Sequence, residues 1–213
     1  MTATKRSITT TTDRKMRNNL RSWFMAVTNK EAEQGLAWYG EAQDFVKQTA
    51  DLFGHSTYLV ACVLSMLSPN NKWERNKFDC LQVLTAFRDG VPPKDVKVCT
   101  YSANKLKAFK ALATGETDFA ASSPKTHSFA MNCGLLSSDH ITIDKWHIRA
   151  CLTKPTEGVT DCVESITPKQ YRRVEALTAT LCKEINDDLR FTKLHGFQFQ
   201  AMLWICIKNV WDR

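Results

Sequence analysis

The chain has 213 residues, of which 43% are hydrophobic and 24% are charged, a balance that is typical of a folded globular protein. Its formal net charge of +7 favours an anionic partner, and nucleic acid is the first candidate. No apolar run reaches the roughly 20 residues of a membrane-spanning helix, and no signal-peptide core is present, so we expect no membrane association.

The predicted elements are helical almost throughout. The threonine-rich, basic residues 1–15 indicate a disordered tail. Apolar residues recur at helical spacings over 16–54, and the nearly all-apolar run 56–67 predicts a central buried helix. Further helices are predicted over 73–87, 101–113, 124–133, 168–185 and 196–211, the third of them ending before Gly134. Only the β-branched run 140–143 is typical of an extended segment, so we expect an all-α chain.

Eight cysteines occur, and none forms a Cys-x-x-Cys pair of the kind that binds zinc. Most lie in apolar surroundings, as Cys62 and Cys206 do, which indicates reduced core residues of an intracellular protein. We therefore expect a protein of the cytoplasm or nucleoid that needs no metal and no cofactor.

Lys125 and Asp144 are the strongest candidates for chemistry. Ser122 or Ser123 suits a helix cap and Pro124 suits the first helical position, which places Lys125 in a first turn. Asp144 is placed to cap the next helix, so the amine and the carboxylate are expected to converge near two helix N-termini. The partial positive charge there, with partial burial, favours a neutral lysine that forms Schiff bases, and an ionised aspartate that stabilises a cationic transition state. On spacing alone, an ordinary lysine and an ordinary cap remain the simpler explanation.

The sequence around this pair resembles the helix-hairpin-helix DNA glycosylase superfamily, most closely its bifunctional glycosylase/lyase members such as the oxoguanine glycosylases. The run ITIDKWHIR at 141–149 matches the family pattern around the essential aspartate, which follows the nucleophilic lysine by about nineteen residues. Residues 58–71 and 73–87 are similar to the first two barrel helices, 102–109 to the segment before the hairpin, and 198–204 to the closing helix.

The resemblance implies a two-lobed, all-α helix-hairpin-helix glycosylase fold with the active cleft between the lobes. One lobe would combine residues 16–54 with 144–213, and the other would be a helical barrel over 55–143. It also implies base excision with β-lyase (AP lyase) activity on a flipped, damaged or modified base. Lys125 would attack the sugar C1′ and form a Schiff base, and Asp144 would stabilise the developing positive charge.

One departure from the family concerns the hairpin, which usually carries glycines whose amides hold a DNA phosphate. This chain has AASSPK at 120–125, with no glycine. Amides of Ser123 and Lys125, and hydroxyls of Ser122, Ser123 and Thr126, could replace them. The four-cysteine iron–sulfur cluster of some family members is also absent from the sequence.

Further residues are implied to contact DNA. The corner after the first barrel helix holds polar side chains that would fill the gap left by the flipped nucleotide, although an ordinary helix connection explains them equally well. The complete set of expected contacts is Asn70, Asn71, Lys72, Arg75, Lys105, Ser123, Thr126, His127, Trp146, His147 and Arg149.

Two alternatives stay open at this point. Some phage relatives of the superfamily build hypermodified pyrimidines, and here Lys125 would join an amino group to an activated base or merely bind. The chain could also be a DNA-binding module that kept the fold and lost the chemistry, which predicts salt-sensitive binding without a covalent intermediate. In each case we expect a monomer whose partner is DNA.

Overall fold

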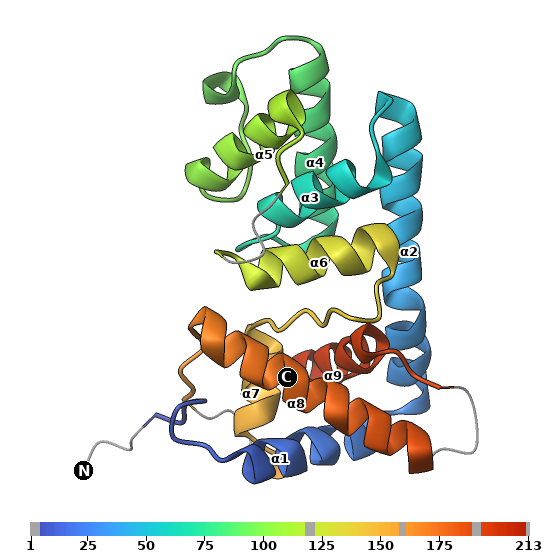
Figure 1. Ribbon diagram of the computed structural model, residues 1–213, viewed down its shortest axis with the longest axis vertical. Helices are drawn as coiled ribbons and strands as arrows, with labels where there is room; N and C mark the ends of the chain where they lie inside the picture. Colours follow the sequence, from blue (N-terminus) through green and yellow to red (C-terminus); the bar gives the residue numbers. More distant parts are fainter. Residues whose placement is uncertain (1–4, 118–121, 158–160, 189–192, 212–213) are drawn as a thin grey trace. The chain divides into compact units, whose positions relative to one another are not determined.

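The structure, a computed structural model, describes residues 5–117, 122–157, 161–188 and 193–211. Within these ranges the chain forms nine α-helices and two short 3-10 turns, so the predicted all-α class is confirmed (Figure 1). The chain divides into two compact units: Met1–Tyr39 with Ser138–Arg213 form unit 1, and Gly40–Ser137 form unit 2. These boundaries differ from the predicted lobes because the long helix α2, Asn29–Phe53, contributes residues to both units.

Unit 2 is built around α3 (Thr57–Leu67), as the all-apolar sequence of this helix predicts. Ser56 caps the helix by accepting a hydrogen bond from the Leu59 amide, and every residue from Val60 to Leu67 is buried. Three helices pack against α3 in this unit: α4 (Trp73–Arg88), α5 (Ser102–Thr114) and α6 (Pro124–Leu135) (Figure 1). The start of α6 is therefore held on a rigid, buried support.

The predicted end of α6 before Gly134 is wrong. The helix continues to Leu135, and Leu136 takes the left-handed conformation with φ 48°. Gly134 serves packing instead, because a Cβ at this position would lie 2.8 Å from the Ala61 Cβ on α3. The glycine thus allows two helices to approach closely, which a local reading of helix-stop signals does not detect.

Unit 1 packs α1 (Asp13–Ala26) against α7 (Lys145–Leu152), α8 (Pro168–Asp188) and α9 (Gly196–Trp211). Two buried side chains of α1 hold the end of α7. The Trp23 Nε1 donates to the Thr153 carbonyl at 2.8 Å, and the Asn19 Nδ2 donates to the Cys151 carbonyl at 2.8 Å. These contacts place the short helix that begins after Asp144.

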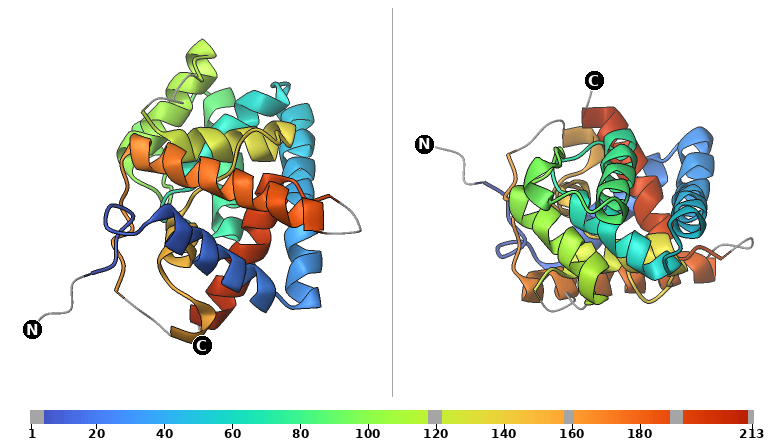
Figure 2. Two further views of the ribbon diagram at one scale, coloured as in Figure 1. Left: turned by 60° about the horizontal axis from the view of Figure 1, so that its bottom comes forward. Right: turned by 90° about the horizontal axis from the view of Figure 1, so that it is seen from above.

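In place of the predicted disordered tail, residues 5–12 lie against the rest of unit 1. Ile8 is only 1% exposed, and Arg6 forms an isolated parallel bridge with Cys162. The Arg6 guanidinium also donates to the Leu152 carbonyl at 3.0 Å and pairs with Glu157. Figure 2 shows this blue N-terminal segment beside the orange chain that leads to α8. Residues 1–4 of the predicted tail lie outside the described ranges.

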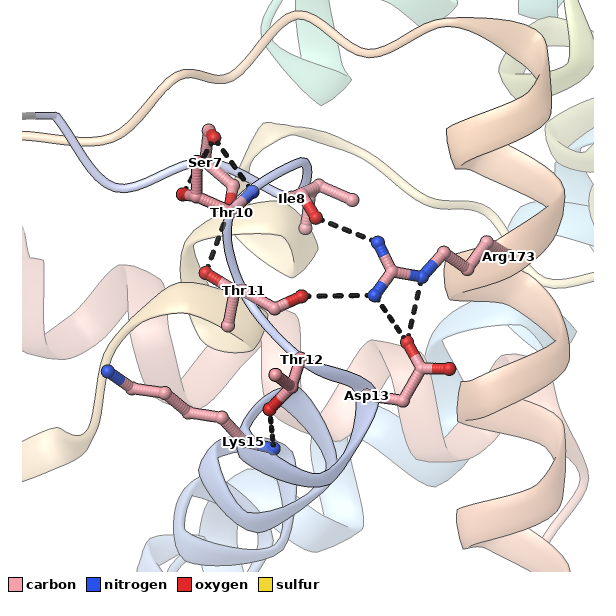
Figure 3. A network of polar contacts seen from close by, with 8 residues as sticks. All are labelled: Ser7, Ile8, Thr10, Thr11, Thr12, Asp13, Lys15 and Arg173. Atoms are coloured by element: carbon pink, nitrogen blue, oxygen red, sulfur yellow. Dashed lines mark hydrogen bonds and ion pairs between the residues drawn. The ribbon is translucent and has the colours of Figure 1, made fainter.

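A single arginine of α8 fixes the same segment (Figure 3). The Arg173 guanidinium donates to the carbonyls of Ile8 and Thr11 at 2.8 and 3.0 Å, and it pairs with Asp13 at 2.6 Å. Thr12 then caps α1 by accepting from the Lys15 amide. The order of this segment therefore depends on an arginine some 160 residues away in sequence.

Within the described residues, no single helix has both the length and the apolar character to cross a membrane. Only α2 and α3 taken together satisfy those two criteria, and they are bent by 114° at their junction.

Candidate functional site

Lys125 lies in the first turn of α6, in unit 2. Pro124 occupies the helix start as predicted, and Ser123 is the N-cap residue, although its side chain makes no capping hydrogen bond. The partial burial expected for Lys125 is not seen, because the residue is exposed. The Ser65 hydroxyl on α3 donates to the Thr126 carbonyl at 2.5 Å and fastens this first turn to the buried helix. The lysine amine is thus presented from an anchored helix N-terminus.

A pocket of about 210 Å³ opens at the residues that flank Lys125 in sequence. Lys110 pairs with Glu116 at 2.6 Å, and Lys107 adds a second ammonium to the lining. With the partial positive charge of the α6 N-terminus, this balance favours a small anion. The volume is below the roughly 300 Å³ of pockets for drug-sized ligands, so it suits a group such as a phosphate. The lining residues are Met66, Asn104, Lys107, Lys110, Glu116, Ser122, Ser123 and Thr126.

The corner between α3 and α4, also in unit 2, is organised around the fully buried carboxylate of Asp79. One oxygen accepts from the Arg75 Nε at 2.8 Å. The other accepts from the Asn71 Nδ2 at 2.9 Å and from the Cys99 amide at 2.7 Å. Asn71 and Arg75, two of the predicted DNA contacts, are therefore held by a residue that the sequence reading did not single out.

Two exposed aromatic residues join this corner. Asn70 has a left-handed backbone, with φ 57°, and its side chain is hydrogen-bonded to the Tyr101 hydroxyl. Tyr101 is 60% exposed and Phe78 is 54% exposed, and the Arg75 guanidinium lies 5.0 Å from the Phe78 ring centroid. Lys72, at the N-cap of α4, is exposed as well. The sequence reading missed both aromatic residues because each belongs to a stretch that is typical of an ordinary amphipathic helix.

Lys105 and His127 are two further residues of unit 2 that the sequence predicts to contact DNA. The Lys105 ammonium donates to the Val96 carbonyl at 2.6 Å, so it holds the chain between the 3-10 turn Pro93–Asp95 and α5. His127 is partly buried in the first turns of α6.

Asp144, in unit 1, caps α7 as predicted. Its Oδ1 accepts from the His147 amide at 2.9 Å, and its backbone is extended. The preceding segment is fixed by α8, because the Tyr171 hydroxyl donates to the Ile141 carbonyl at 2.8 Å and accepts from the Ile143 amide at 3.1 Å. The carboxylate is partly exposed and lies at the positive end of the α7 dipole.

The phosphate contact predicted for His147 is wrong, because this side chain is 1% exposed. Its Nε2 lies 2.8 Å from the Thr178 Oγ1, and that hydroxyl donates to the Val174 carbonyl, so it accepts from the imidazole Nε2–H. Burial lowers the pKa of His147 to about 3. A neutral, inaccessible imidazole holds α7 to α8 and has no means of meeting a phosphate.

Arg149 is also engaged within unit 1. Its guanidinium lies 4.5 Å from the Trp146 ring centroid and 5.0 Å from that of Trp211, and its Nε donates to Glu164 at 2.7 Å. The side chain is 19% exposed, so little of it is left for the predicted phosphate contact. Trp146, expected to contact DNA, is partly buried in this stack. The stack ties α7 to the C-terminal end of α9.

A second aromatic cluster of unit 1 joins α2 and α9. Trp38 and Trp204 are both partly exposed, with ring centroids 5.7 Å apart. Beside them the Tyr39 hydroxyl donates to the Oε1 of Gln200, which is 4% exposed. The sequence reading assigned Trp204 to the core on helical spacing alone, which does not separate a core ring from one at the rim.

Lys125 therefore belongs to unit 2 and Asp144 to unit 1. The convergence of their charged groups stays a prediction. Among the described residues, no group of three or more histidine, cysteine or acidic side chains could hold a metal ion. All eight cysteines are free thiols, six of them buried, while Cys99 is exposed and Cys162 partly so.

A family model matches residues 2–210 of the chain. The chain belongs to the family of unknown function DUF7178. No curated protein and no solved structure matches it. The description of DUF7178 names no activity.

Proposed function

We propose that this protein is a DNA glycosylase with β-lyase activity that removes a damaged or modified base through a lysine Schiff base. The observation that carries the proposal is Lys125, exposed in the first turn of α6 beside an anion-favouring pocket. The motif ITIDKWHIR supplies the second group, Asp144 at the N-terminus of α7. The proposal includes the two-lobed helix-hairpin-helix glycosylase fold, in which both residues act on one nucleotide.

In the proposed reaction, the Lys125 side chain gives up a proton to solvent and its amine attacks the sugar C1′ as the bond to the base breaks, and the base leaves with the bonding electron pair. Asp144 stabilises the positive charge that develops on the sugar. Opening of the sugar ring gives the Schiff base between C1′ and the lysine nitrogen. β-Elimination then removes a proton from C2′ to solvent, forms the C2′–C3′ double bond and breaks the C3′–O bond, so that the 3′ phosphate leaves. Water then hydrolyses the Schiff base, which gives an aldehyde at C1′ and releases the lysine amine.

The pocket at the start of α6 supports the binding of a DNA phosphate at the position where helix-hairpin-helix glycosylases use glycine amides. The Ser123 and Thr126 hydroxyls and the Lys107 ammonium are groups that bind phosphate oxygens. The Lys110 ammonium, which is paired with Glu116, would contact the phosphate as well. In this glycine-free sequence, AASSPK, side-chain donors would then hold the phosphate in place of backbone amides.

Exposed aromatic side chains support the handling of unpaired nucleotides. Bases extruded from a duplex are commonly held by stacking on aromatic rings. Trp38 and Trp204 offer such rings in unit 1, and Tyr101 with Asn70 offers a ring and an amide in unit 2. We further propose that the protein acts as a monomer on DNA in the cytoplasm or nucleoid, of a cell or of a phage-infected host, and needs no cofactor.

The test is covalent trapping. The protein is incubated with duplexes and single strands that carry uracil, oxoguanine, hydroxymethyluracil or an abasic site, and borohydride is added to reduce any Schiff base. We expect an adduct that Lys125→Gln abolishes while DNA affinity changes by less than about twofold, because Lys125 is not one of the residues that line the proposed phosphate pocket. Asp144→Asn should slow adduct formation by about a hundredfold.

The matched control is Lys107→Gln, the same charge change in the pocket lining. It should weaken DNA binding and still allow trapping when DNA saturates the protein. An adduct that persists in Lys125→Gln would sink the assignment of the nucleophile, and the absence of any adduct on abasic DNA would sink the lyase.

The second candidate is an enzyme that joins an amino group to an activated pyrimidine in DNA. The glycine-free hairpin favours it, since a weaker hold on duplex phosphate suits a substrate other than ordinary damaged duplex. Product analysis separates the two activities, because free base appears only with the glycosylase. A non-catalytic DNA-binding module would give binding without either product.

A further inference from the structure

The buried carboxylate of Asp79 joins three separate parts of unit 2. Its three donors come from the loop after α3 (Asn71), from the first turn of α4 (Arg75) and from the segment before α5 (the Cys99 amide). The carboxylate is 0% exposed, so these contacts are made out of water and replace its hydration. A carboxylate accepts at both oxygens, which lets one side chain serve all three donors.

The segments that Asp79 joins carry one exposed surface, formed by Asn70, Lys72, Arg75, Phe78 and Tyr101. The loop after α3 contributes the Asn70 amide, which is hydrogen-bonded to Tyr101 of the other segment. The α4 side adds Phe78, 54% exposed, with the half-exposed Arg75 over its ring. Glu74 is paired with Lys77 at 2.9 Å and Asp79 with Arg75 at 2.8 Å, so the exposed Lys72 ammonium gives these side chains a net positive charge.

Exposed aromatic rings between cations and an amide are the groups that bind unpaired nucleotides. The rings stack on base faces, the cations meet phosphates, and the amide meets base edges. Tyr101 and Phe78 are both more than half exposed, and stacking on the flat faces of bases would remove their rings from water.

We infer that Asp79 is a positioning residue: it holds the loop after α3 and the segment before α5 in the relative positions that let this surface bind an unpaired nucleotide. The inference rests on the proposed function for the identity of the ligand as DNA. Asp79 touches no nucleotide itself. It acts through Arg75, whose guanidinium it aims, and through Asn71 and the Cys99 amide, which place Asn70 and Tyr101.

The informative variant is Asp79→Asn, which keeps the shape of the side chain. An asparagine has one acceptor oxygen and one NH₂ group, so either Arg75 or the pair formed by Asn71 and the Cys99 amide must face a donor. The matched control is Val83→Ala, which removes a fully buried side chain from the same helix and leaves the Asp79 contacts intact. Comparison of the two separates loosening of the surface from general destabilisation of α4.

Two readouts on the full-length protein decide the question. Backbone hydrogen exchange should accelerate about tenfold over residues 68–72 and 97–101 in Asp79→Ala, which removes both acceptor oxygens, and not in Val83→Ala, which keeps them. Fluorescence anisotropy should show that the wild type prefers a duplex with an unpaired nucleotide over a fully paired one. In Asp79→Asn the ratio of the two affinities should fall by about tenfold, while the affinity for the fully paired duplex stays unchanged.

Three outcomes would overturn the inference: unchanged exchange in Asp79→Ala, equal loss of preference in Asp79→Asn and Val83→Ala, or a wild type that binds both duplexes equally. Failure of the proposed enzymatic activity has a different signature, the absence of a borohydride adduct. That result leaves the preference for an unpaired nucleotide and its dependence on Asp79 in place.

Discussion

His147 should make the stability of unit 1 fall steeply with acid. The imidazole is 1% exposed, donates through Nε2 to Thr178, and has a pKa lowered to about 3 by burial. In the unfolded chain the same group titrates near 6.5. Between these two pKa values the unfolded state binds one proton that the folded state does not bind, so acid favours unfolding.

The loss of folding free energy caused by His147 is small at neutral pH. It grows as the pH drops below 6.5, by about 1.4 kcal/mol per pH unit. With a folded-state pKa of about 3, the loss between about pH 7 and about pH 5 comes to about 2 kcal/mol. That is a large part of the roughly 5–15 kcal/mol by which native domains are stable. The stability stops falling with pH only near the folded-state pKa of His147, about 3.

Urea unfolding of the wild type and of His147→Gln at these two pH values measures the effect. Glutamine can donate to Thr178 and does not titrate, so the variant should lose about 2 kcal/mol less than the wild type on acidification, whatever its stability at neutral pH. His195→Gln, at an exposed histidine of the same unit, should behave as the wild type does. Parallel losses in the wild type and His147→Gln would refute the assignment of a buried neutral imidazole.

Two further predictions concern packing and the N-terminal segment. Gly134→Ala should lower the free energy of unfolding by about 1–3 kcal/mol, because the added Cβ meets Ala61 at 2.8 Å. In the same urea assay Gly40→Ala, a helical position with open space around it, should be neutral or stabilising, and equal effects would contradict the packing argument. Arg173→Ala should speed tryptic cleavage after Lys5 or Arg6 about tenfold, because it releases the carbonyls of Ile8 and Thr11. Arg172→Ala, which removes an exposed pair with Glu175, should leave the cleavage rate unchanged, and equal rates in both variants would show that Arg173 does not hold the segment.

Local signals were sufficient for most of the fold. The periodicity of apolar residues predicted the helices, and helix starts were found where the physical cause lies within a few residues, as at Ser56, Pro124 and Asp144. The errors arose where distant packing decides the conformation. The end of α6 depends on contact with α3, and the ordered N-terminal segment depends on Arg173 of α8.

The same division separates the parts of the candidate site. Placement of Lys125 and Asp144 at helix starts follows from their neighbours in sequence. The inward orientation of His147 depends on Thr178, and the enclosure of Arg149 is completed by Trp211. Both partners lie on helices more than thirty residues away, so a linear motif gives no sign of them. Asp79 was missed for a related reason, since nothing in its own helix shows that a carboxylate is buried there.

The Tyr171 hydroxyl protects the backbone of residues 141–143 from pairing with a strand of another molecule. Extended backbone normally presents a row of amides and carbonyls to which a strand of another molecule can add. Along 141–143 the amides of Ile141 and Ile143 and the carbonyl of Ile141 are bonded to Glu175 and Tyr171 of α8. Two helix side chains thus substitute for a neighbouring strand, and this edge is closed to intermolecular sheet formation even though the segment itself is rich in β-branched residues.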